Sequence, residues 1–158
     1  GIIIPTPILA DEKLSRDVGA RAYLKAECLQ RSGSFKVRGA YNKISRLSPD
    51  EKARGVITAS AGNHAQGVAL AAKLHDIRAT IVLPEFAPLT KVNATKSYGA
   101  DVVLYGATFD DAVARSRELQ KEHGYTYVHA FDDPQVIAGQ GTIGWEIVED
   151  LPGATVVV

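Results

Sequence analysis

The 158-residue sequence has no methionine, one cysteine, one tryptophan and no net charge. Its single cysteine, Cys28, cannot form an internal disulfide, and no group of cysteines and histidines has the spacing of zinc ligands. The 18 basic and 18 acidic residues balance, and no apolar run is long enough to span a membrane. We therefore expect a cytoplasmic protein with no metal site and with neither nucleic acid nor membrane as a partner.

The two ends of the sequence are unusual for a complete protein. The chain starts at Gly1, and it finishes on the apolar run ATVVV (154–158), which is typical of a buried strand. A chain that stopped inside a core strand would leave backbone groups unpaired. We therefore expect this sequence to be part of a longer protein.

Short β-branched runs alternate with longer helical stretches along the whole chain. Strands are predicted at 22–26, 56–59, 79–83, 101–105, 126–130 and 154–158. Helices are predicted at 35–47 with Ser34 as N-cap, at 62–75, from Pro88 to Gly99, and over 108–124 with Gly124 as C-cap. This alternation predicts an α/β fold built on a mostly parallel sheet.

Ligands of such sheets lie at the carboxyl ends of the strands, where loops lead into helices. Two predicted loops are therefore candidate ligand sites, TASAGNHAQG (58–67) and AFDDPQVIAGQG (130–141). The first places Ser60 and Asn63 among small residues, so that backbone N–H groups can point outward together and bind an anion. An ordinary N-cap would need one serine or asparagine, whereas this loop has a whole run of small residues.

Three other patterns have simpler explanations. The sequence GQGTIG (139–144) matches a dinucleotide fingerprint but follows no strand directly, and we expect it to allow close helix packing. The four histidines are scattered, which favours structural or surface roles over metal binding. Asp132 and Asp133 precede Pro134, and this step favours a turn and helix cap over paired acid–base carboxylates.

Lys36 stands in SGSFKVRGA (32–40) at a predicted helix start, where the helix dipole disfavours its charged form. Burial beside Phe35 would disfavour the charge further. An amine that is partly neutral can attack a carbonyl and form a Schiff base. A solvated lysine in a first helical turn explains the residue equally well, so the residues alone leave both interpretations open.

Four separated segments together resemble pyridoxal-phosphate enzymes of the fold type II group, in particular the threonine dehydratases (threonine ammonia-lyases) of the serine/threonine-dehydratase kind. The segments are QRSGSFKVRGAYNKI, TASAGNHAQGVALAAKL, GATFDDA and DDPQVIAGQGTIGWEI, which occur in this order over nearly the whole chain. The resemblance implies pyridoxal 5'-phosphate as cofactor, held covalently by Lys36. Phe35 corresponds to an aromatic residue that packs on the cofactor ring, and Asn63 to the asparagine that bonds the ring's phenolic oxygen. The loop that grips the substrate α-carboxylate corresponds to Ser60, Gly62, Asn63 and His64.

The implied activity is the deaminating β-elimination of L-threonine to 2-oxobutanoate and ammonia, and of L-serine to pyruvate. Similar racemases have a second serine where this chain has Ala61, which favours elimination over racemisation. A serine racemase-like enzyme and a non-catalytic form of the fold are the alternatives. Arg31 and Ser32 correspond to positions where relatives bind an adenine nucleotide at a subunit interface, although a plain turn would also explain them. The expected partners are an amino-acid substrate and, in the full-length protein, further copies of the same chain.

The resemblance also implies a division into domains. Residues 1–51 would begin a large catalytic domain, 52–137 would form a small αβ domain, and 138–158 would return to the large domain as a helix and a strand. The family continues into a glycine-rich loop for the cofactor phosphate, which would follow ATVVV. We therefore expect these 158 residues alone to bind the cofactor weakly and to turn over little.

Overall fold

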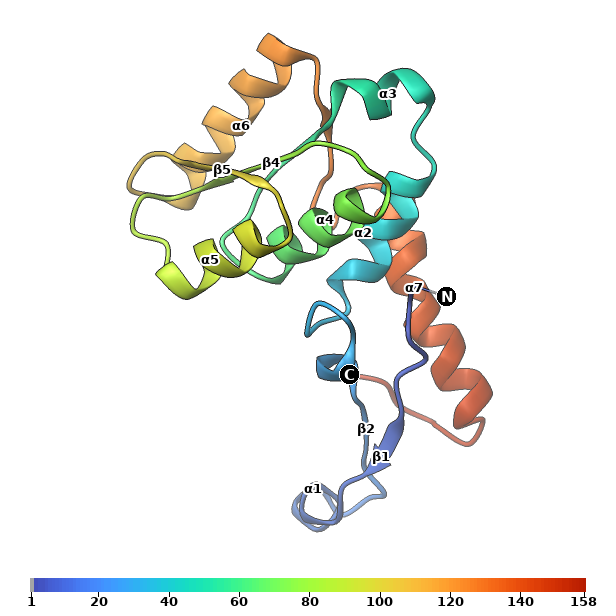
Figure 1. The fold of residues 1–158 in the computed structure, drawn as a ribbon. Helices are drawn as coiled ribbons and strands as arrows, with labels where there is room; N and C mark the ends of the chain where they lie inside the picture. The colour runs from blue at the N-terminus through green and yellow to red at the C-terminus, as the bar shows by residue number, and fades with distance from the viewer. Residues whose placement is uncertain (1) are drawn as a thin grey trace.

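The computed structural model describes residues 2–158, and its centre is a four-stranded parallel sheet in the order β5-β4-β3-β6 (Figure 1). The strands are β3 (Val56–Ala59), β4 (Ala79–Leu83), β5 (Asp101–Leu104) and β6 (Thr126–Tyr127). Three of these strands lie where the sequence predicts them, while β6 is shorter than its predicted range of 126–130. The predicted α/β fold with a parallel sheet is confirmed.

Helices cover both faces of this sheet, which is why β3 and β4 are buried along their whole length. One face packs against α4 (Asn63–Leu74) and α5 (Leu89–Ser97), and the other against α6 (Phe109–His123). Neighbouring residues of one strand pack on opposite faces of the sheet. Ile81 packs on the face covered by α4, and Val82 packs on the face covered by α6. The result is a three-layer sandwich of helix, sheet and helix (Figure 1).

A second group of elements packs beside the sandwich. Helix α2 (Lys36–Ser45) lies between α4 and the long α7 (Pro134–Asp150), and it touches both. The antiparallel pair β1 (Ile8–Ala10) and β2 (Tyr23–Lys25), with α1 (Glu12–Val18) between its strands, extends away from the sheet (Figure 1). A short 3-10 turn, η1 (Glu27–Leu29), leads from β2 towards α2, and α3 (Pro49–Arg54) leads from α2 into β3.

Several predictions of local structure are wrong. The run 154–158 forms no strand, because no other strand in residues 2–158 pairs with its backbone, and its valines are exposed. Residues 134–141 are helical rather than a loop, since α7 already begins at Pro134. The N-cap of α2 is Phe35, and the Ser34 hydroxyl only accepts a long 3.4 Å bond from the Lys36 N–H.

Other boundaries move by one or two residues or were not foreseen. Pro88 is the N-cap of α5, which begins at Leu89 and ends at Ser97. Gly124 ends α6 in the left-handed conformation, as predicted. The sequence did not predict β1, α1 or α3, all of which are short.

The predicted division at 51/52 and 137/138 stays a prediction, and α7 runs without a break through residues 137 and 138. No helix among residues 2–158 has both the length and the apolar character needed to cross a membrane.

Candidate active site

Lys36 is the first residue of α2 and reaches across to the chain that follows β6. Its Nζ donates a hydrogen bond of 2.9 Å to the carbonyl oxygen of Ala130, and it lies 5.2 Å from the centre of the Phe35 ring. Burial lowers the pKa of Lys36, because the charged form loses solvation in this position. The amine therefore loses its proton more easily than that of a solvent-exposed lysine.

The loop after β3 brings small residues to the start of α4. The buried hydroxyl of Ser60 accepts hydrogen bonds from the N–H groups of Gly62 (3.2 Å) and Ala65 (3.3 Å), which folds the loop tightly. Within residues 2–158 the N–H groups of Asn63 and His64 donate to no acceptor. These free N–H groups at a helix N-terminus form the kind of site that binds a carboxylate.

His64, the second residue of α4, turns inward and is buried. Its Nε2 donates a 3.0 Å bond to the carbonyl oxygen of Val128. Burial, with a further contribution from the charge of Lys36, lowers the pKa of His64 to about 4. The imidazole is therefore neutral at physiological pH, and its Nδ1 is a buried acceptor that has no partner within residues 2–158.

The chain after β6 joins these two side chains. The N–H of Val128 still donates to Ile57 of β3, at 2.9 Å, but β3 then turns away at Ser60. The next backbone carbonyls, of Val128 and Ala130, are taken by the side chains of His64 and Lys36. Two helices that begin 27 residues apart in sequence thus meet at the carboxyl end of two neighbouring strands.

Gly67 allows this meeting. A Cβ atom at Gly67 would lie 3.0 Å from the backbone of Lys36 and Val37, so glycine here lets α4 approach the start of α2 without crowding. The two predicted motifs, 32–40 and 58–67, therefore belong to one site. The sequence did not reveal the carbonyls of Val128 and Ala130, because a backbone acceptor has no residue signature.

The sequence GQGTIG lies inside α7 rather than in a strand-to-helix loop, which contradicts a dinucleotide site. A Cβ at Gly139 would lie 2.6 Å from the Arg38 oxygen and the Gly39 Cα, and a Cβ at Gly39 would lie 2.5 Å from Gln140. The glycines therefore serve the close crossing of α2 and α7. The packing interpretation is confirmed, and the contact lies in the second turn of α7.

Asp133 is the N-cap of α7, as predicted. Its Oδ1 accepts from the N–H groups of Gln135 (2.8 Å) and Val136 (3.2 Å), and its Oδ2 pairs with Lys43 at 2.9 Å. Asp132 is exposed and does not form a carboxylate pair with it. The helix-cap interpretation of these aspartates is confirmed.

Arg31 and Ser32 lie in the turn before α2, outside the group around Lys36. The Arg31 Nε donates to the Ile2 carbonyl at 2.7 Å while the residue is exposed. Ser32 is buried, and its hydroxyl donates to the Ser34 carbonyl at 3.3 Å.

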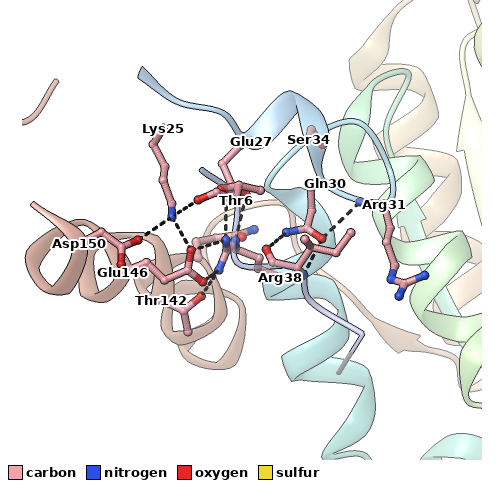
Figure 2. A network of polar contacts seen from close by, with 12 residues as sticks. Thr6, Lys25, Glu27, Gln30, Arg31, Ser34, Arg38, Thr142, Glu146 and Asp150 are labelled. Atoms are coloured by element: carbon pink, nitrogen blue, oxygen red, sulfur yellow. Dashed lines mark hydrogen bonds and ion pairs between the residues drawn. The ribbon is translucent and has the colours of Figure 1, made fainter. Parts of the chain in front are cut away.

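A network of buried charges holds α2 from the side opposite α4 (Figure 2). The guanidinium of Arg38, with only 1% of its side chain exposed, forms paired bonds to Glu27 (2.7 and 2.9 Å) and to Glu146 (2.6 and 2.9 Å). Burial opposes the charge of Arg38, but the bonds to both carboxylates outweigh it and raise its pKa. Lys25 of β2 also contacts Glu146, at 2.7 Å. The network connects β2, η1, α2 and α7 two residues from Lys36, and the sequence pattern did not predict it.

Comparison with known proteins shows the family of this chain. The family model described as "Pyridoxal-phosphate dependent enzyme" matches residues 1–158. An L-threonine ammonia-lyase of Thermotoga maritima is 54% identical over 99% of this chain and 39% of that protein. The processed form of threonine deaminase isoform 2 from Solanum lycopersicum is 52% identical with a TM-score of 0.91, over 95% of this chain and 41% of that one. Maize serine racemase is 38% identical with a TM-score of 0.91, over 96% of this chain and 46% of that one.

The chain therefore spans less than half the length of each of these relatives. The family resemblance expected from the four sequence segments is confirmed, since the match runs over the whole chain. Because the family model matches the whole chain and the fold agrees with it, the chain belongs to the pyridoxal-phosphate dependent enzymes.

Proposed function

We propose that this chain carries the lysine and the carboxylate-binding loop of a threonine/serine dehydratase. The reaction would be the β-elimination of L-threonine to 2-oxobutanoate and ammonia, and of L-serine to pyruvate and ammonia. The observation that carries the proposal is the meeting of Lys36 with the 60–64 loop at the carboxyl end of β3 and β6. The similarity to an L-threonine ammonia-lyase at 54% identity supports the choice of substrate.

The residues present fit pyridoxal phosphate. Lys36 offers a half-buried amine of lowered pKa, which is suited to covalent attachment to an aldehyde. Phe35 is next to this amine and 38% exposed, so its ring can pack on an aromatic cofactor, and the exposed amide of Asn63 can donate to a ring oxygen. When bound, the cofactor supplies an electron sink for the substrate α-carbon.

The chain's own residues would hold the substrate and move its protons. The free N–H groups of Asn63 and His64, in the loop folded by Ser60 and Gly62, would hold the α-carboxylate. This leaves the α-proton on the side of Lys36, whose neutral amine would accept it at Nζ. His64 stays uncharged, so it does not compete with the loop for the substrate's carboxylate.

Racemisation is the second candidate, because maize serine racemase is 38% identical to this chain. Ala61 argues against it, since its methyl group provides no proton for the face of the substrate opposite Lys36. Elimination needs only the one base. A non-catalytic protein of the same fold is the third possibility.

The test is to incubate the intact protein, pyridoxal phosphate and either L-threonine or L-serine, and to measure 2-oxo acid and D-amino acid together. We expect 2-oxo acid from both substrates, no D-serine, and loss of product in Lys36→Ala. An excess of D-serine over pyruvate would favour the racemase. Absence of both products would favour the non-catalytic protein.

Three further features belong to the proposal. Arg31 and Ser32 would contact a nucleotide effector, and of the two only Arg31 is exposed. The full-length protein would form a homo-oligomer. The single cysteine is consistent with a place in the cytoplasm.

A further inference from the structure

His129, directly after Val128, holds the backbone that follows it in a fixed turn. Its Nδ1 accepts a 2.8 Å hydrogen bond from the Asp132 N–H and a 3.3 Å bond from the Phe131 N–H. The Phe131 ring packs edge-on against the imidazole, with 4.6 Å between ring centres and 87° between planes. An Nδ1 atom that accepts two hydrogen bonds cannot carry a proton, so the imidazole proton is on Nε2.

Ala130 lies inside this turn, and its carbonyl accepts the Lys36 amine. On one side the chain is fixed at Val128, by the bond to Ile57 of β3 and by His64. On the other side it is fixed by the two bonds to His129. The direction of the Ala130 carbonyl is therefore set by His129 as much as by the sheet.

The direction of this carbonyl matters for the lysine. A neutral amine that donates one N–H to the Ala130 oxygen points its lone pair away from that oxygen. The lone pair is the part that attacks an aldehyde or accepts a proton, so a fixed carbonyl limits the directions from which the amine can attack.

We propose that His129 is a positioning residue for Lys36, acting through the Ala130 carbonyl; the proposal rests on the proposed function of Lys36. His129 itself bonds to neither Lys36 nor His64. His64, from α4, is a titratable group whose pKa the charge of Lys36 lowers, and it stays neutral above about pH 4.

The test compares His129→Leu, which removes the acceptor, with His129→Asn, whose Oδ1 can replace Nδ1 as acceptor. His123→Leu is the matched control, since His123 is an exposed histidine at the end of α6. Two quantities are measured on the intact protein without cofactor or substrate. They are the hydrogen exchange of the Phe131 and Asp132 amides, and the pH midpoint of Lys36 acetylation by acetic anhydride, mapped by mass spectrometry.

We expect His129→Leu to speed exchange at both amides at least tenfold. We also expect it to lower the Lys36 midpoint by about one pH unit, because the Ala130 carbonyl is no longer held towards the ammonium. His129→Asn and His123→Leu should match the wild type in both measurements. An unchanged Lys36 midpoint in a folded His129→Leu protein would overturn the proposal.

If His129→Leu does not fold, nitrogen NMR of the His129 imidazole in the wild type still tests the proposal, because it shows which ring nitrogen carries the proton. A proton on Nε2 is required, and a proton on Nδ1 would overturn the proposal. Because no cofactor or substrate is used, these results do not depend on whether the protein is a dehydratase. The failure of either proposal can therefore be recognised separately.

Discussion

The side chains of Lys36 and His64 donate hydrogen bonds to backbone carbonyls of the same short segment after β6. Burial disfavours the charged form of each and lowers both pKa values. At neutral pH the site therefore presents an uncharged imidazole and an amine that gives up its proton readily. This is the state in which an amine can act as nucleophile and base.

The burial of His64 predicts a pH-dependent stability. Its pKa lies near 4 in the folded protein and near 6.5 when unfolded, so the unfolded chain binds the extra proton as the pH falls between these values. The free energy of unfolding should fall by about 3 kcal/mol from pH 7 to pH 4 through this residue. Urea denaturation of wild type and His64→Gln at both pH values measures this.

In His64→Gln the loss of stability on acidification should be smaller, since no imidazole remains to take up the proton. A residual slope will come from His75, whose pKa is also lowered by burial, and from carboxylates of lowered pKa such as Glu146. His123→Gln, at the exposed end of α6, is the control. An equal loss of stability in wild type and His64→Gln would refute this account of His64.

At the scale of elements, α2 is fixed from two sides. Gly67 lets α4 approach the first turn of α2, and Gly39 and Gly139 let α7 cross it. The Arg38 network then binds α2 to η1 and α7 (Figure 2). The position of Lys36 thus depends on the packing of helices that do not themselves touch its amine.

Arg38→Met should destabilise the protein by about 3 kcal/mol, because the mostly buried Glu27 and Glu146 would lose their common partner while Glu146 keeps Lys25. Arg78→Met is the matched control, since Arg78 forms a 2.9 Å pair with Asp101 that is mostly exposed. Its loss should cost about 1 kcal/mol or less. Chemical denaturation of the two variants side by side provides the measurement. Equal losses would show that the buried network adds nothing specific.

Two glycines of α7 should respond oppositely to alanine. In Gly139→Ala the new Cβ would lie 2.6 Å from the backbone of α2, and we expect a loss of about 3 kcal/mol or more as the helices separate. In Gly144→Ala the Cβ meets no atom within 4 Å, and the better helix former should add about 0.5–1 kcal/mol. Thermal unfolding distinguishes these outcomes, and similar effects at both positions would contradict the close crossing.

At the scale of the whole molecule, the sequence predicts the helix–sheet–helix sandwich better than it predicts the elements that pack beside it. The bounds of β3 and β4 agree with the prediction, because a strand buried on both faces has a continuous β-branched run. The three-residue strands β1 and β2 depend on each other for pairing, and of these two the sequence suggested only β2. The run 154–158 has strand character, but no strand among residues 2–158 pairs with it, so composition alone does not place it in the sheet.

The sequence also indicates part of the candidate site. Lys36 and the 60–64 loop stand out because their residue types are unusual for a helix start. The acceptor of Lys36 lies 94 residues away and is a backbone carbonyl, which no local pattern announces. The side chain of His129, which folds the backbone around that carbonyl, likewise has no periodic signal.

The central claim is that Lys36 is the amine that reacts with pyridoxal phosphate. The most direct test is to mix the intact protein with pyridoxal phosphate, reduce with borohydride, and map the modified lysines by mass spectrometry in wild type and Lys36→Ala. We predict one strongly labelled site, at Lys36, because this amine is half-buried and of lowered pKa while Lys13 and Lys91 are exposed. Label spread over the exposed lysines, and equal in Lys36→Ala, would contradict the account.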